Sequence, residues 1–194
     1  MIHSPLVGPL TLGPLGAELR KLGFEVVLPD LREALMGPRP QWRAIVDLAM
    51  AAADSVDVIV AHSGAGVLMP LLAEQLRPDV VAFVDAVVPG DALAYQASEL
   101  FIGFVDSLSQ DGSLLPPWHE WWGDDVMSRL IPDGDQRRGC CFLRLSPAYD
   151  DDRARAETYE WPTARMAGQH LDVAVKPVAV CESLMRLIER AQSH

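Results

Sequence analysis

Lysine and cysteine are scarce in this sequence, and the few copies present form no recognisable site. Among the 16 basic side chains the lysines are Lys21 and Lys176, and 27 acidic side chains give a net charge of −11. A nucleic-acid-binding protein needs a basic face, so this class is not expected. The cysteines, Cys140, Cys141 and Cys181, include no CxxC pair. We therefore expect neither a disulfide framework nor a metal site, and a reducing compartment.

Long apolar runs are also missing. The first residues, 1–19, lack a basic segment and are interrupted by Pro5, Pro9 and Pro14, which is unlike a signal peptide. No apolar run reaches the roughly 18 residues that a membrane helix needs. We therefore expect a cytoplasmic protein that does not bind membranes.

The chain has 194 residues, 49% of them hydrophobic, which is enough for a single domain with a sizeable core. Its strand-like apolar stretches lie at 24–28, 56–61, 80–84, 140–145 and 162–166. Helical patterns separate them at 14–22, 42–53, 64–76 and 152–159, and another follows at 177–191. Apolar strands separated by helices indicate an α/β fold, with a mostly parallel sheet covered by helices on both faces. Residues 90–139 break this pattern with prolines and glycines, and we expect a short lid there, within one domain spanning 1–194.

The stretch Ala61-His62-Ser63-Gly64-Ala65-Gly66 carries the main chemical signal. A predicted strand runs directly into Ser63, and small residues surround it, as in a nucleophile elbow. A serine on a strained strand-to-helix turn needs small neighbours because the backbones approach closely there. The N–H of Gly64 could then stabilise an oxyanion. The alternative is that Ser63 only caps the following helix.

A nucleophilic serine needs a base, and His170 is the candidate. It lies between the last predicted strand and the final helix, so it and Ser63 should meet at the carboxyl edge of the sheet. With this pair in order, the chain resembles the α/β-hydrolase superfamily. Four segments carry the resemblance: 3–9 resembles its oxyanion loop, 28–31 the strand end that follows, 61–66 its elbow, and 168–170 its histidine loop.

The resemblance also implies a catalytic acid, and two residues fit it. The superfamily places the acid after the strand that precedes the histidine loop, and there Asp150 is the first choice. Asp85, at the end of the strand after the elbow helix, occupies an alternative position of the superfamily. Asp151 and Asp152 fit better as the acidic first turn of the next helix.

The sequence departs from the superfamily in two ways. The strands that usually precede the oxyanion loop are missing, so we expect a smaller sheet whose edge is exposed or covered by a partner, such as a second copy in a homodimer. Pro5 falls near an expected oxyanion donor and has no N–H. Either Leu6 donates instead, together with Gly64, or the oxyanion hole is weakened, which disfavours peptidase activity.

The expected function is acyl transfer through an acyl-serine, in which an ester or thioester is hydrolysed without a cofactor. The substrate would be a small molecule or an acyl group on a carrier, held in part by aromatic lid residues, namely Trp118, His119, Trp121 and Trp122. One alternative is an acyltransferase of natural-product biosynthesis, similar to hydrolase-fold enzymes that move indolyl groups in thiopeptide pathways. It would transfer an aromatic acyl group from a carrier-protein thioester to a peptide acceptor. Another is a non-catalytic binding module, which Pro5 and the missing strands favour and the intact Ser63 and His170 oppose.

Overall fold

The computed structural model describes residues 1–4, 7–36, 41–90, 129–130 and 139–193. These residues form a four-stranded parallel sheet of order β1-β2-β3-β4. The strands are β1 Val58–Ser63, β2 Val80–Ala86, β3 Gly139–Arg144 and β4 Thr163–Arg165. The fold class predicted from the sequence, a parallel sheet with helices, is therefore confirmed.

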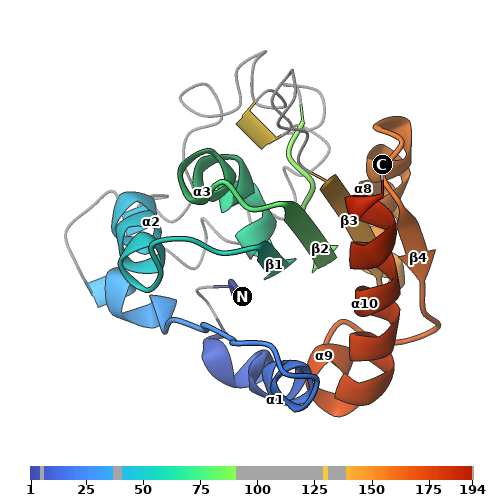
Figure 1. The fold of residues 1–194 in the computed structure, drawn as a ribbon, viewed down its shortest axis with the longest axis horizontal. Coiled ribbons are helices and arrows are strands. Elements are labelled where there is room, and N and C mark those ends of the chain that lie inside the picture. The colour runs from blue at the N-terminus through green and yellow to red at the C-terminus, as the bar shows by residue number, and fades with distance from the viewer. Residues whose placement is uncertain (5–6, 37–40, 91–128, 131–138, 194) are drawn as a thin grey trace.

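Helices cover both faces of this sheet (Figure 1). The α-helices are α1 Gly13–Lys21, α2 Gln41–Ala51, α3 Met69–Leu76, α8 Asp150–Thr158, α9 Asp172–Val175 and α10 Pro177–Gln192. The 3₁₀ helices are η1 Pro9–Thr11, η2 Leu31–Met36, η3 Gly64–Leu68 and η4 Pro147–Tyr149. Helices α1, α9 and α10 pack on one face, and α2, α3 and α8 pack on the other.

Strand β2 shows why the sheet lies between two helical layers. All seven of its residues are buried, and successive side chains of a strand point to opposite faces. Val80, Ala82 and Val84 belong to the core under α1 and α10, whereas Val81 and Phe83 belong to the core under α2 and α3. Burial of both faces explains the continuous apolar run in the sequence.

The segment before β1 differs from the prediction. Residues 24–28 form no strand in the described structure. Instead Ile2 extends the sheet, since it pairs in parallel with Ala61 of β1 and its N–H donates to Val60 O at 2.7 Å. Val27 O accepts a hydrogen bond from the Met1 amino group at 2.7 Å. The short apolar run at 24–28 therefore lies beside the first residues without completing a ladder.

The helix after Ser63 is divided into η3 and α3, and Pro70 is the second residue of α3. In the first turn of a helix the missing N–H of proline costs no helical hydrogen bond. Among the described residues, no helix combines the length and the apolar character needed to cross a bilayer. The predicted lid, 90–139, lies almost entirely outside the described residues.

Candidate active site

Ser63 is the last residue of β1 and sits on a strained turn. Its backbone has φ 61° and ψ −135°, a left-handed conformation that is unfavourable for a residue with a Cβ. The register of the β1–β2 pairing shifts between His62 and Ser63, and η3 begins at the next residue. This is the strand-to-helix turn that the elbow motif predicts.

Gly66 shows why the elbow needs small residues. A Cβ at this position would lie 1.9 Å from Val87 O and 3.0 Å from Val87 N. The Val87 N–H in turn donates to Ser63 O at 3.1 Å. The chain leaving β2 thus packs directly against the elbow, and only glycine leaves room for it.

Asp85 and His170 form a hydrogen-bonded pair at the same sheet edge. Asp85, at the end of β2, is fully buried and has φ 44°. Its Oδ2 accepts a hydrogen bond from His170 Nδ1 at 2.9 Å. Burial alone would raise the pKa of Asp85, but hydrogen bonds from His170, Ser146 and Leu145 outweigh burial and lower it. The buried carboxyl is therefore kept ionised beside the imidazole.

Three of these hydrogen bonds come from the first residues after β3. Leu145 N donates to Asp85 Oδ1 at 2.7 Å, and Ser146 N donates to the same oxygen at 3.0 Å. Ser146 Oγ donates to Asp85 Oδ2 at 2.6 Å. The loop after β3 thus supplies hydrogen-bond donors to the acid rather than the acid itself.

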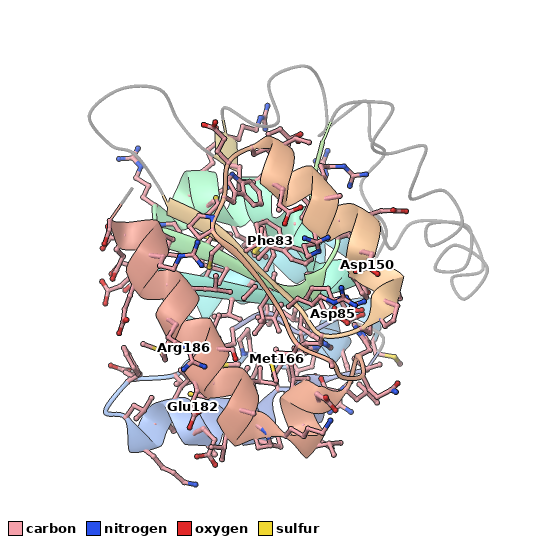
Figure 2. The ribbon with its side chains drawn as sticks, turned by 90° about the vertical axis from the view of Figure 1, so that its right-hand side faces the viewer. Phe83, Asp85, Asp150, Met166, Glu182 and Arg186 are labelled. Atoms are coloured by element: carbon pink, nitrogen blue, oxygen red, sulfur yellow. The ribbon has the colours of Figure 1, made fainter. Side chains whose placement is uncertain are left out.

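Asp150, the first choice for the acid, is not beside the histidine. It accepts two hydrogen bonds from the Arg144 guanidinium, at 2.8 and 2.9 Å. Arg144, at the end of β3, has a side chain only 3% exposed and draws the carboxylate to itself. Figure 2 shows Asp150 on α8 and Asp85 as a separate carboxylate. The structure therefore corrects the first choice and pairs the histidine with the alternative, Asp85.

Two aromatic rings pack on the imidazole of His170. The ring of His62 stacks on it at 4.4 Å between centroids, and the ring of Tyr149 stacks at 5.1 Å. His62 Nε2 also donates to His170 O at 3.1 Å. Burial, followed by the charge of His170, lowers the pKa of His62 to about 4, so its ring is neutral near pH 7.

Tyr149 also reaches the serine, which the sequence analysis missed. Its hydroxyl lies 3.2 Å from Ser63 Oγ, within hydrogen-bond distance, and Tyr149 itself is 8% exposed. Its position three residues after Ser146 gave no sequence signal, because the contact depends on how η4 folds back over the sheet edge.

The loop expected to form part of an oxyanion hole is held by His3. This buried ring accepts a hydrogen bond from Leu31 N at 3.1 Å through Nε2, and Nδ1 donates to Ser4 O at 2.7 Å. Burial lowers the pKa of His3, in keeping with a neutral ring. Gly64, expected to donate from the elbow, is buried directly after Ser63. The other expected contributors, Leu6, Trp118, His119, Trp121 and Trp122, lie outside the described residues.

The described residues thus bring a serine, a histidine and a buried carboxylate to the carboxyl ends of β1, β2 and β4. Ligands of open α/β sheets bind at this edge. Tyr149 contacts both the hydroxyl on the strained turn and the imidazole of His170, whose Nδ1 is held by the buried carboxylate. A hydroxyl, an imidazole and a carboxylate are the groups that a nucleophile, its base and an orienting acid require.

No protein-family model and no curated protein matches this sequence. Solved structures do resemble it. An extracellular α/β-hydrolase from a Paenibacillus species has a TM-score of 0.62 at 16% identity, with 96% of each chain covered. Polyneuridine aldehyde esterase has a TM-score of 0.60 at 14% identity, covering 96% of this chain and 98% of that one. The thioesterase domain from the curacin biosynthetic pathway has a TM-score of 0.55 at 14% identity, covering 95% and 88%. The chain has the α/β-hydrolase fold, as its motifs predicted.

Proposed function

We propose that this chain, with its α/β-hydrolase fold, hydrolyses carboxylic esters or thioesters through an acyl-enzyme on Ser63. The observation that carries the proposal is the hydrogen bond between His170 Nδ1 and the buried Asp85 at 2.9 Å, at the sheet edge that also holds Ser63 on its strained turn. The similar structures include both an esterase and a thioesterase domain, and so the proposal includes both substrate classes.

In the proposed acylation, His170 Nε2 takes the Ser63 Oγ proton while Oγ bonds to the acyl carbon. The carbonyl π electrons move to its oxygen. Asp85 holds the Nδ1–H of His170 and stabilises the imidazolium. The intermediate then expels the alcohol or thiol, which takes the proton from His170. Water repeats the sequence on the acyl-serine, which releases the acid and restores Ser63.

The oxyanion would be stabilised by the N–H of Gly64 and by a donor from the loop that follows His3. We propose Leu6 as the second donor, since Pro5 has no N–H. The hydrogen bond from Leu31 N to His3 Nε2 supports this assignment, because it fixes the start of that loop to Leu31. Losing one oxyanion donor typically costs about 10²–10³ in rate.

The experiment is labelling with a fluorophosphonate, read out by intact mass. The wild-type protein should gain one adduct, and both Ser63→Ala and His170→Ala should gain none. Ser55→Ala, which removes an exposed serine before β1, is the matched control and should react like the wild type. An unlabelled but folded wild-type protein, or labelled Ser63→Ala, would contradict the proposal and favour a non-catalytic binding module.

Hydrolysis and transfer would be separated by the fate of the acyl group. We propose hydrolysis because water, activated by His170, is enough to release the acyl group from Ser63, and no other acceptor is needed. With an acyl thioester as substrate, free acid should therefore form at least as fast as the transfer product of an added amine or peptide. Transfer product that outruns the acid once an acceptor is present would instead support the acyltransferase alternative.

A further inference from the structure

Tyr149 contacts Ser63 and His170, the proposed nucleophile and base, and the proposed mechanism assigns Tyr149 no role. Its hydroxyl lies 3.2 Å from Ser63 Oγ. Its ring stacks on the His170 imidazole at 5.1 Å between centroids, with an interplanar angle of 12°. A residue that touches the nucleophile with one atom and the base with its ring can influence how the two meet.

The direction of the hydrogen bond between Ser63 and Tyr149 follows from where the proton of each hydroxyl must lie. Burial is the main reason that the pKa of Tyr149 is raised to about 12, so the phenol keeps its proton near pH 7. The Ser63 proton has to point toward His170 if the imidazole is to remove it. Both demands are met when the phenol donates and Ser63 Oγ accepts.

We propose that Tyr149 is a positioning residue for the nucleophile, whose hydroxyl donates to Ser63 Oγ and leaves the serine proton directed at His170. The inference rests on the proposed function, because it assigns Tyr149 a part in activating Ser63. A serine hydroxyl otherwise rotates among several staggered positions. The phenol favours the reactive one, and its ring limits the movement of the imidazole that receives the proton.

The backbone around Tyr149 is anchored well enough for this task. Tyr149 N donates to Ser146 O at 3.2 Å, and Ser146 is itself bound to Asp85 through Oγ and N. The next residue, Asp150, is held by Nε and Nη2 of the Arg144 guanidinium. The backbone of Tyr149 is therefore anchored, through Ser146, to the same carboxylate that orients His170. One short loop thus contacts Ser63, His170 and Asp85.

The test is the rate of fluorophosphonate labelling in Tyr149→Phe, which keeps the ring and removes only the hydroxyl. We expect the bimolecular labelling constant to fall by about three- to tenfold, as the loss of one neutral hydrogen bond implies. For an activated ester, kcat should fall similarly while KM stays within about twofold, because Tyr149 acts through Ser63. Tyr159→Phe, near the other end of α8, is the matched control and should label at the wild-type rate.

Each outcome separates this inference from the proposed function. Labelled wild type and a slower Tyr149→Phe, with equal melting temperatures, would support the positioning role. Equal labelling rates in wild type and Tyr149→Phe would overturn that role and leave the acyl-serine proposal intact. An unlabelled wild type would overturn both. A change in KM alone for Tyr149→Phe would also overturn the positioning role, since the hydroxyl would then act on the substrate.

Discussion

His170 Nδ1 and Asp85 Oδ2 lie 2.9 Å apart, although 85 positions separate the two residues in the sequence. Asp85 is the second-last residue of β2 and His170 follows β4, with β3 between these strands in the sheet. The carboxylate thus reaches past the end of β3, where Leu145 and Ser146 donate hydrogen bonds to it. One buried acid therefore joins the ends of three neighbouring strands, and the histidine loop is fixed to that junction.

This arrangement predicts that Asp85 and Asp150 respond differently to removal of charge. Asp85→Asn should lower kcat for an activated ester by about 10³–10⁴-fold, because the amide no longer stabilises the imidazolium or fixes its tautomer. Asp150→Asn should leave kcat within roughly fivefold of the wild type. It should lower the melting temperature, because the buried Arg144 loses its bidentate partner.

The two measurements are steady-state ester hydrolysis and thermal unfolding of the same preparations. A loss of kcat in Asp150→Asn as large as that in Asp85→Asn would return the role of acid to Asp150. A full retention of kcat in Asp85→Asn would remove the acid from the proposed mechanism altogether.

The close approach at the elbow gives a second prediction. Gly66→Ala should destabilise the protein by several kcal/mol or prevent folding, because the new Cβ would meet backbone atoms of Val87 that cannot move aside. Gly13→Ala, where a Cβ meets nothing within 4 Å, is the matched control and should raise the free energy of unfolding by about 0.4–1 kcal/mol. Urea titrations of both variants measure this difference. Equal stability of the two variants would contradict the packing seen at the elbow.

The elbow was predictable because its chemistry is local. Ser63 and the small residues beside it lie on consecutive positions, and the strained φ of 61° is the reason that this pattern is needed. The position of His170 at the sheet edge was predictable from its order in the chain, because it follows the last strand. The strands β1 to β3 were also predictable, since burial on both faces makes them continuous apolar runs.

The partner of His170, the contact between Tyr149 and Ser63, and the segment 24–28 depend on tertiary contacts instead. The sequence favoured Asp150, but Arg144, six residues earlier, binds that carboxylate, and no local pattern reveals the pairing. Asp85 has a positive φ of 44°, a backbone conformation that no pattern in the sequence predicts. Tyr149 reaches Ser63 only because η4 folds back over the sheet edge.

The hydroxyl of Ser146 should matter through Asp85. Its Oγ donates to the same carboxylate oxygen that accepts the His170 N–H, so Ser146→Ala should raise the pKa of Asp85 and lower kcat by about three- to tenfold. Ser146→Thr, which keeps a hydroxyl, should recover part of the loss. Kinetics of the two variants with one activated ester measure this effect.

Ser146→Ala should also change how the free energy of unfolding depends on pH. Asp85 has a folded-state pKa below its usual value of 3.8. Its ionised form therefore stabilises the protein above that value, and the contribution is lost as pH falls through the folded pKa. Because Ser146→Ala weakens this contribution, the difference in free energy of unfolding between wild type and variant should shrink as pH falls below about 4. A difference that is constant with pH would show that the hydroxyl does not act on the Asp85 carboxylate.

His62 should make the protein less stable in mild acid. Its pKa is about 4 in the folded protein, mainly because of burial, against the ordinary 6.5. Between these values the unfolded chain binds more protons, so the stabilising contribution of neutral His62 is complete above pH 6.5 and falls as pH is lowered toward 4. His62→Gln should flatten this dependence, because the glutamine amide can still donate to His170 O but does not titrate. Urea unfolding of both proteins at pH 7.5 and pH 5 measures the change.

The comparison isolates His62 because the other titrating groups are the same in both proteins. Asp152, whose pKa is raised to about 6 mainly by burial, acts in the opposite direction: its contribution falls as pH rises from 3.8 to 6. This effect cancels in the difference between wild type and His62→Gln. If both proteins lose the same free energy of unfolding between pH 7.5 and pH 5, then His62 is not held neutral by burial, and its ring stacks on His170 without linking the fold to pH.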